Sequence, residues 1–145
     1  MDYLGAFEIS ASGMVAEKTR LETIAQNLAN AKTTQTKTGG PYKPHKVITA
    51  ARTESSFESH LGTRRYNSRS MGVDVVSILP TNSEPRMMYE PGHPDADEKG
   101  FVAYPKIDSV SEMVSLIEAV RGYEANVRAL NVAKSMALKA LEIGR

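Results

Sequence analysis

The sequence predicts an α+β fold in which long N- and C-terminal helices pair as a coiled-coil-like core, with a small β-rich insert containing proline and glycine between them. Three observations favour this fold. All 7 prolines lie between Pro41 and Pro105, so both ends lack the residue that breaks helices. Both ends carry apolar residues at alternating steps of three and four, and the middle alternates short apolar runs with turns. We therefore expect an N-terminal core helix over 1–31, an insert over 32–107 and a C-terminal core helix over 108–145, the two helices forming one discontinuous domain.

Length and composition agree with one folded domain, because the chain has 145 residues of which 41% are hydrophobic and 24% are charged. A formal net charge of +1 gives no general attraction to nucleic acid or to an anionic membrane. Charged residues interrupt every apolar run, so we expect no direct membrane insertion. The N-terminus carries Asp2 and lacks a basic segment, so we expect no cleaved signal peptide. The absence of cysteine excludes disulfides and thiolate chemistry.

The predicted N-terminal helix carries a seven-residue repeat that is typical of a coiled-coil seam, at Phe7, Met14, Leu21 and Leu28. Gly5 and Gly13 weaken its first half by roughly 1 kcal/mol each relative to alanine. Asn27 and Asn30 are three residues apart and share a face. Two interpretations of this pair stay open: the amides bond between helices and fix their register, or they only terminate the helix.

The predicted C-terminal helix continues the same pattern over about four heptads, with its seam at Met113, Leu116, Val120, Tyr123, Val127, Leu130, Ala137 and Leu141. Ser109 to Glu112 is typical of a capping box at its start, and Gly144 stands where a helix would end. Further apolar residues, among them Val132 and Leu138, lie off the seam. A helix that is apolar on several sides needs partners on several sides, so we expect other subunits to cover the rest.

In the insert we expect strands over 46–50, 71–79 and 100–104, with turns near Gly39 and Pro91 between them. Large apolar residues are few in this part of the chain. The insert should therefore have a modest core that depends on its surroundings.

The residues capable of chemistry do not form a recognisable site. His93, Asp95 and Asp97 come nearest to a metal-ligand cluster, but acidic residues beside proline are more typical of a solvated turn. A loop that pairs with acidic neighbours is a better interpretation than a nucleic-acid site for the basic patch of Arg64, Arg65, Tyr66 and Arg69. The sequence has no phosphate-binding glycine loop and no nucleophile elbow. We therefore expect no catalytic, metal-binding or cofactor-binding residue, no cofactor and no enzymatic activity.

Several motifs resemble those of the flagellar axial proteins, which build the rod and hook. Residues 9–16 and 21–33 resemble the N-terminal signature that these proteins share. Residues 39–42, 89–100 and 112–126 resemble the proximal rod members of the basal body in particular. The likeness covers nearly the whole chain. It departs from the family pattern at residues 43–45 and at Lys106, neither of which lies on a predicted helix seam.

The resemblance implies a structural subunit that the flagellar export apparatus exports and that polymerises helically into the rod, the axle that carries torque from the motor to the hook. The implied location is the basal-body rod where it crosses the periplasmic space. The implied partners are other copies of the chain, other rod subunits, the MS-ring and the export apparatus, with no nucleic acid. The residues expected to pack helices in this assembly are Phe7, Met14, Leu21, Ile24, Asn27, Leu28, Asn30, Met113, Leu116, Val120, Tyr123, Asn126, Val127, Leu130, Ala137 and Leu141.

Three other functions remain compatible with the residues. One is a different axial subunit, of distal rod or hook type, although those proteins generally carry larger central inserts. Another is a coiled-coil adaptor of a secretion system. The third is a small metal-dependent hydrolase built around His93 and Asp95.

Overall fold

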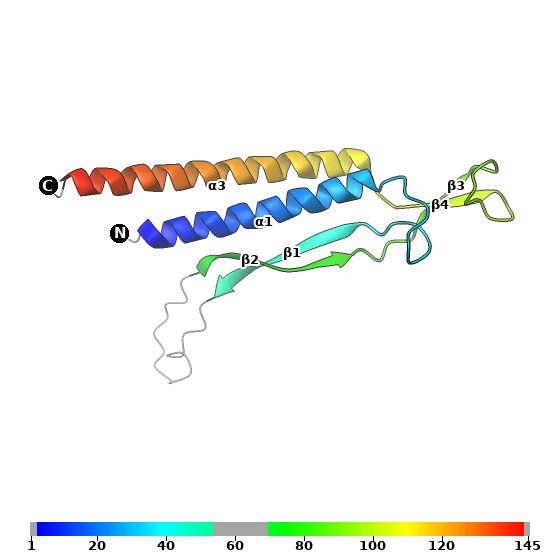
Figure 1. The fold of residues 1–145 in the computed structure, drawn as a ribbon, viewed down its shortest axis with the longest axis horizontal. Coiled ribbons are helices and arrows are strands. Elements are labelled where there is room, and N and C mark those ends of the chain that lie inside the picture. The colour runs from blue at the N-terminus through cyan, green and yellow to red at the C-terminus, as the bar shows by residue number, and fades with distance from the viewer. Residues whose placement is uncertain (1–2, 54–69, 144–145) are drawn as a thin grey trace, which may run out of the picture.

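The computed structural model describes residues 3–53 and 70–143. Its elements in chain order are α1 (Tyr3–Ala29), β1 (His45–Thr53), β2 (Ser70–Pro80), β3 (Arg86–Tyr89), β4 (Phe101–Tyr104) and α3 (Ser109–Ile143). Helix α1 lies between α3 on one side and the β1–β2 hairpin on the other, and β3–β4 projects beyond the far end of the helices (Figure 1). The prediction of an α+β fold with long terminal helices and small antiparallel sheets between them is confirmed. Neither described helix is long and apolar enough to cross a membrane.

The two helices run antiparallel and approach each other through glycine. A Cβ atom placed on Gly13 of α1 would lie 2.8 Å from Nδ2 of Asn126 on α3. A Cβ atom on Gly122 of α3 would lie 3.1 Å from Cδ of Glu17 on α1. Each glycine therefore leaves room for a polar side chain of the other helix, since a larger residue would force that side chain to shift. The sequence interpretation of Gly13 as a weak point in the helix missed this packing role.

Within one subunit, the contact face of α3 is displaced from the predicted seam. Ala119 and Ala133 are its buried residues, and Leu116, Val127, Leu130 and Ala137 are half-buried beside them. The other predicted seam residues are exposed, namely Met113, Val120, Tyr123 and Leu141. The structure therefore does not confirm the predicted coiled-coil pairing along the whole seam, because half of the seam residues on α3 are exposed within the subunit. The reason is that α1 offers glycine and small polar side chains, against which alanine and glycine pack more closely than leucine or methionine.

The β-structure forms two separate antiparallel pairs. Strand β1 pairs with β2 from His45↔Pro80 to Thr53↔Ser70, and its register is interrupted after Ile48 and after Ala51. Strand β3 pairs with β4 from Arg86↔Tyr104 to Tyr89↔Phe101. The strands predicted over 46–50, 71–79 and 100–104 correspond to β1, β2 and β4. Strand β3 was not predicted, because its sequence Arg-Met-Met-Tyr has no alternating pattern and follows a proline.

The apolar core is thin. Among the described residues, the buried hydrophobic side chains are Ala16, Ile24, Val102, Ala119 and Ala133. Of these only Val102 is a large side chain with no exposed surface. Hydrophobic burial is the main source of folding stability, so a subunit with this core gains little of it without neighbours.

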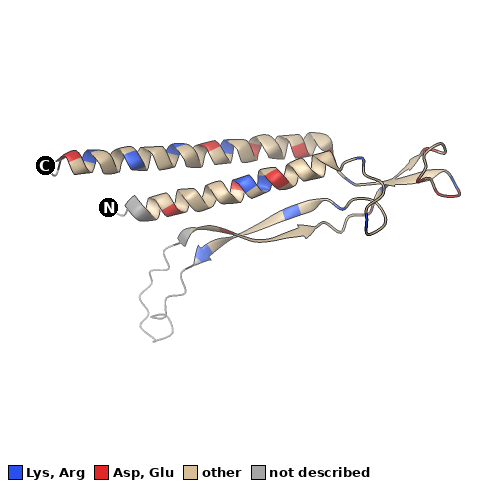
Figure 2. Cartoon of the chain, viewed as in Figure 1, with Lys and Arg blue, Asp and Glu red and all other residues tan. Residues whose placement is uncertain are grey.

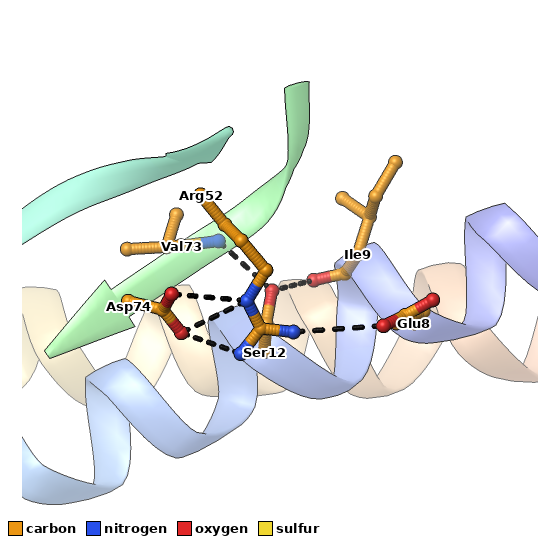
Figure 3. A network of polar contacts seen from close by, with 6 residues as sticks. All are labelled: Glu8, Ile9, Ser12, Arg52, Val73 and Asp74. Atoms are coloured by element: carbon orange, nitrogen blue, oxygen red, sulfur yellow. Dashed lines mark hydrogen bonds and ion pairs between the residues drawn. The ribbon is translucent and has the colours of Figure 1, made fainter. Parts of the chain in front are cut away.

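Polar contacts place the β1–β2 hairpin on α1. The hydroxyl of Ser12 accepts a hydrogen bond from the Val73 N–H at 3.0 Å and donates one to the Ile9 carbonyl at 2.7 Å (Figure 3). Next to Val73, Gly72 has a φ of +108°, and a Cβ atom there would lie 2.1 Å from Oγ of Ser12. Only glycine fits at this point of closest approach between β2 and α1.

An ion-pair cluster of Arg52, Asp74 and Glu8 joins the same three elements. Nε of Arg52 donates to both carboxylate oxygens of Asp74 at 2.9 and 3.0 Å, and its Nη2 also donates to Oδ1 of Asp74. NH1 of Arg52 lies 3.5 Å from Oε1 of Glu8 on α1 (Figure 3). Hydrogen bonding to Arg52 lowers the pKa of Asp74, and the same bonds raise the pKa of Arg52. The cluster connects both strands of the hairpin to α1.

The lowered pKa of Asp74 predicts a loss of stability in acid. Because the folded-state pKa lies below the ordinary value of 3.8, the contribution is complete above that pH and is lost as the pH falls through the folded-state value. We expect the difference in unfolding free energy between the parent and Asp74→Asn to shrink as the pH falls below about 4. Chemical denaturation at a series of pH values measures it.

The matched control is Glu22→Gln, which removes a carboxylate from an exposed pair with Lys18 on α1. This variant should stay close to the parent at every pH, because exposed pairs one helical turn apart contribute little. A difference between the parent and Asp74→Asn that did not change with pH would contradict the prediction.

Candidate assembly site: the Asn27 cluster and the exposed faces

The side chain of Asn27 is 3% exposed and forms the centre of a polar cluster with Tyr42, His45 and Glu112, here called the Asn27 cluster. Its Oδ1 accepts hydrogen bonds from the His45 N–H at 2.9 Å and from the Tyr42 hydroxyl at 3.1 Å. Its Nδ2 donates to the His45 carbonyl at 2.9 Å and lies 3.5 Å from Oε2 of Glu112. The amide therefore bonds both main-chain groups of the first residue of β1, much as a neighbouring strand would.

The Asn27 cluster joins three parts of the chain: the C-terminal end of α1, the start of β1 and the first turn of α3. The Tyr42 hydroxyl also lies 2.9 Å from Nδ1 of His45. Burial and the nearby Glu112 carboxylate raise the pKa of Tyr42, so its hydroxyl is protonated and can donate at neutral pH. A buried amide is costly unless its donors and acceptors are bonded, so the cluster favours one arrangement of these three segments.

Asn30 has a different environment from Asn27. Its Nδ2 donates to the Gln26 carbonyl at 2.9 Å, and its Oδ1 accepts from the Thr33 hydroxyl at 3.2 Å. These bonds are local and close the turn that follows α1. The two interpretations left open by the sequence thus separate: Asn30 terminates the helix, and Asn27 bonds to other elements.

Helix α3 is capped one residue before the predicted capping box. Oδ1 of Asp108 accepts a hydrogen bond from the Val110 N–H at 3.2 Å, which is the position of an N-cap. The prediction of a box from Ser109 to Glu112 is wrong, because the Glu112 side chain lies against Asn27 instead. A groove of about 440 Å³ opens beside this point and is lined in part by Ile24 of α1.

The segment 90–100 is a hydrogen-bonded turn. Oδ1 of Asp97 accepts from the N–H groups of Lys99 and Phe101, and Nδ1 of His93 accepts from the Asp95 N–H. The Thr34 hydroxyl donates to Oδ2 of Asp95 at 2.6 Å, which links this turn to the loop after α1. No group of three potential metal ligands occurs among the residues that the structure describes.

The remaining predicted packing residues divide by element. On α1, Ile24 is buried, and the half-buried ones are Phe7, Met14, Leu21 and Leu28. On α3, Leu116, Asn126, Val127, Leu130 and Ala137 are half-buried, and Met113, Val120, Tyr123 and Leu141 are exposed. That they pack between subunits stays a prediction. The basic patch of Arg64, Arg65, Tyr66 and Arg69 lies outside the described residues.

Charged side chains are spread along both helices with neutral residues between them (Figure 2). Large apolar side chains are exposed among them, including Val110, Val114 and Ile117 in the first half of α3. The charges keep these surfaces hydrated, and the apolar residues leave contiguous area for contact with another protein.

Sequence reasoning missed the contacts between elements that depend on the fold. Arg52 and Asp74 are 22 residues apart, and Ser12 and Val73 are 61 apart, so no local pattern indicates either contact. Gly122 did carry a signal, because a glycine inside an apolar helical pattern often marks a close approach of another element.

Comparison with known proteins connects this geometry to one class. Residues 7–35 match a family model described as flagella basal body rod protein. Residues 98–143 match one described as flagellar basal body rod FlgEFG protein C-terminal. The two matches include most of α1 and all of α3, the elements that the Asn27 cluster joins.

Curated proteins are similar over the full length. A flagellar basal-body rod protein FlgC from Bacillus subtilis is 37% identical over 97% of each chain. Proteins with the same description from Escherichia coli O6:H1 and Salmonella typhimurium are 37% and 36% identical, each over 100% of both chains.

The Asn27 cluster generates a stability prediction. Asn27→Ala leaves both main-chain groups of His45 without their partner, so we expect a loss of roughly 1–3 kcal/mol in the free energy of unfolding. Asn27→Asp should lose at least as much, because a carboxylate cannot donate to the His45 carbonyl and would face Glu112. Urea unfolding followed by circular dichroism measures both.

Asn30→Ala is the matched control for the Asn27 variants. It removes the same side chain one helical turn away but loses only local bonds, so we expect a change below about 1 kcal/mol. Equal effects of the Ala substitutions at Asn27 and Asn30 would contradict the role assigned to the cluster.

The turn at 90–100 generates a second prediction. Substituting His93, Asp95 and Asp97 together by alanine removes bonds that hold the turn, so we expect a loss of about 1 kcal/mol with motility retained or mildly reduced. The parent should contain no bound metal in elemental analysis, and chelator should not change motility. Stoichiometric zinc, calcium or manganese in the purified protein would overturn this expectation.

Proposed function

Because the chain belongs to the FlgC family of flagellar basal-body rod proteins and is therefore a structural rod subunit, we propose that it polymerises helically into the proximal rod and transmits torque from the motor to the hook. Its neighbours in this proposal are other copies of the chain, other rod subunits and the MS-ring. Agreement with full-length FlgC proteins favours this over a distal rod or hook subunit.

The observation that carries the proposal is the exposure of α3. Large apolar side chains are exposed along its length, from Val110 and Ile117 near its start to Val132 and Leu138 near its end. Apolar surface of this extent on several sides of one helix is unstable in water and favours contact with other proteins. Helix α1 covers only one side, so the other sides are available to neighbouring subunits.

Helical polymerisation follows from how such surfaces can be used. The exposed residues lie on different faces from those that contact α1 within the subunit. Contacts between two different surfaces of identical or similar subunits are heterologous, and they generate open helical assemblies when the rotation does not close. Packing of antiparallel helices along such an assembly would give the stiffness that a drive shaft needs.

The thin core supports export through the flagellar apparatus. A subunit with few buried apolar side chains has little to lose on unfolding, and it gains stability only when neighbours cover its faces. We propose that it passes through the growing rod unfolded and folds on reaching the tip. Its location would then be the part of the rod that crosses the periplasmic space.

We propose a mechanical role and no catalytic one. His93, Asp95 and Asp97 are engaged in the hydrogen bonds of a turn. His45 and Glu112 contact the buried amide of Asn27. In each case a side chain that could take part in catalysis or metal binding makes a structural hydrogen bond instead. This is consistent with a protein that acts through its contacts with other subunits.

The substitution Leu130→Asp tests the packing of α3. Leu130 is half-buried in one subunit, and a carboxylate buried there by neighbours would cost several kcal/mol, roughly 2–5, in the assembled rod. The unfolded chain pays no such penalty during export. We expect secreted protein in the medium, few completed basal bodies in electron micrographs and loss of motility.

Asn131→Asp is the matched control, because it introduces the same carboxylate at the next position of α3 in place of a side chain that is already polar, so no apolar contact is lost. It should assemble and swim like the parent. Normal swimming of the Leu130→Asp strain would show that this face of α3 is not packed in the rod.

A further inference from the structure

The small β3–β4 sheet has one apolar face that is exposed among the residues that the structure describes. Tyr89 and Phe101 are paired in the ladder, and Met87 lies two residues before Tyr89, so the three side chains share a face. Met87 is 52% and Tyr89 65% exposed. Figure 1 shows their sheet, β3–β4, at one end of the molecule, beyond the helices. The opposite face carries Val102, which is fully buried. We call the exposed side the tip face.

The segment that carries the tip face has a net negative charge. The segment 84–104 holds five carboxylates against two basic residues. Some of these carboxylates are engaged, since Glu90 accepts from the Tyr104 hydroxyl and Asp97 holds the turn. Glu84 and Glu98 are exposed. The tip therefore combines an exposed apolar surface with a net negative charge, a combination that suits a small protein contact.

The other end of the molecule has a surface of the opposite charge. Arg128, Val132, Met136 and Lys139 follow one another on α3 at steps of four, four and three, which places them on one helix face. Val132 is 57% and Met136 48% exposed. Arg128 contacts Glu124 at 3.8 Å, and its side chain is still 82% exposed. We call these four residues the α3 end stripe.

The two surfaces are similar in length, and they lie at opposite ends. The strands of the tip are 4 residues each, or about 13 Å long, and the end stripe rises by about 16 Å along α3. Figure 1 shows β3–β4 beyond one end of the helix pair and the C-terminal end of α3 beyond the other. They cannot meet within one subunit, but they can meet between successive subunits.

We propose that the tip face of one subunit docks on the α3 end stripe of a second copy of this chain, giving a head-to-tail contact. Tyr89 and Met87 lie against Val132 and Met136, with Glu98 near the basic side chains of the stripe. Charge complementarity argues for a second copy as the occupant, because this one chain carries both the acidic tip segment and the basic α3 end stripe. The contact is heterologous and leaves both outer ends free, so it extends without closing.

This contact rests on the proposed function and specifies one of its interfaces. Contacts below about 1,200 Å² in total area are usually transient, so the pair should be weak in solution and stable only in the assembled rod. The experiment therefore traps the contact covalently. The chain has 0 cysteines, so introduced cysteines report only on the positions chosen.

The test is disulfide cross-linking of the purified full-length protein with copper phenanthroline. A mixture of Tyr89→Cys and Met136→Cys single variants should give a mixed dimer in excess over either homodimer. The double variant should give a ladder of multimers. The matched control pairs Tyr89→Cys with Glu118→Cys, which is exposed on the other half of α3 and should cross-link weakly. A ladder no stronger than this control, or a dominant Tyr89→Cys homodimer, would overturn the proposal.

Charge reversal tests the charge complementarity between the tip face and the α3 end stripe. Glu98→Lys and Lys139→Glu should each lower the yield of the ladder by about two- to fivefold, the size of an exposed ion pair, and their combination should restore it. Equal losses in single and combined variants would contradict the predicted pairing.

The same double cysteine variant, expressed in motile cells, separates this inference from the proposed function. Incorporation into basal bodies without a self-adduct would support a rod subunit and overturn the head-to-tail contact, and an adduct with another rod subunit would replace the second copy as occupant. Failure to reach basal bodies would count against the proposed function itself. A self-adduct in isolated basal bodies supports both.

Discussion

The buried amide of Asn27 is the contact on which the arrangement of the three segments depends. It bonds both main-chain groups of His45 and lies against Glu112, so α1, the hairpin and α3 meet at one side chain. A buried polar group tolerates few alternatives, because any shift of register leaves donors or acceptors without partners. The apolar core is too thin to impose a register of that kind. Toward the other end of α1, Ser12 and the Arg52 ion-pair cluster contact the hairpin, so α1 and the hairpin are joined near both ends.

The inside of the subunit is built from small and polar residues, and much of the large apolar surface lies outside. Between the helices, Gly13 meets Asn126 and Gly122 meets Glu17. Such contacts define geometry but contribute less free energy than the burial of leucine or methionine. The reverse distribution would stabilise a monomer and leave nothing for its neighbours. In a rod subunit the larger gain in free energy is available only on assembly, which couples the stability of each chain to its place in the structure.

The sequence was sufficient to predict the helices and most strands, because proline position and apolar periodicity are local signals. It was insufficient to predict which face of α3 contacts α1, because residues available to other proteins and residues that contact α1 produce overlapping patterns. Leu116 and Leu130 are half-buried, whereas Met113 and Val120 are exposed, although all four fit one repeat. The three-residue spacing indicated that Asn27 and Asn30 share a helix face. Their different partners depend on the path of the chain after α1, which the spacing does not show.

The contacts also explain why a polar interior is compatible with a stiff assembly. Stiffness against bending and torsion comes from the number of fixed contacts per length and not from the free energy of any one of them. A hydrogen bond to a buried amide has narrow limits of distance and angle, and a glycine that approaches another element leaves little space for sliding. Within the subunit, Asn27 supplies a constraint of the first kind, since its amide is buried with 3% exposure. Gly72 of β2 supplies one of the second kind, since a Cβ atom on it would lie 2.1 Å from Oγ of Ser12 on α1. In the rod that we propose, close-packed apolar contacts between subunits would also resist sliding, so the directional contacts inside each subunit and the packing between subunits would resist torsion together.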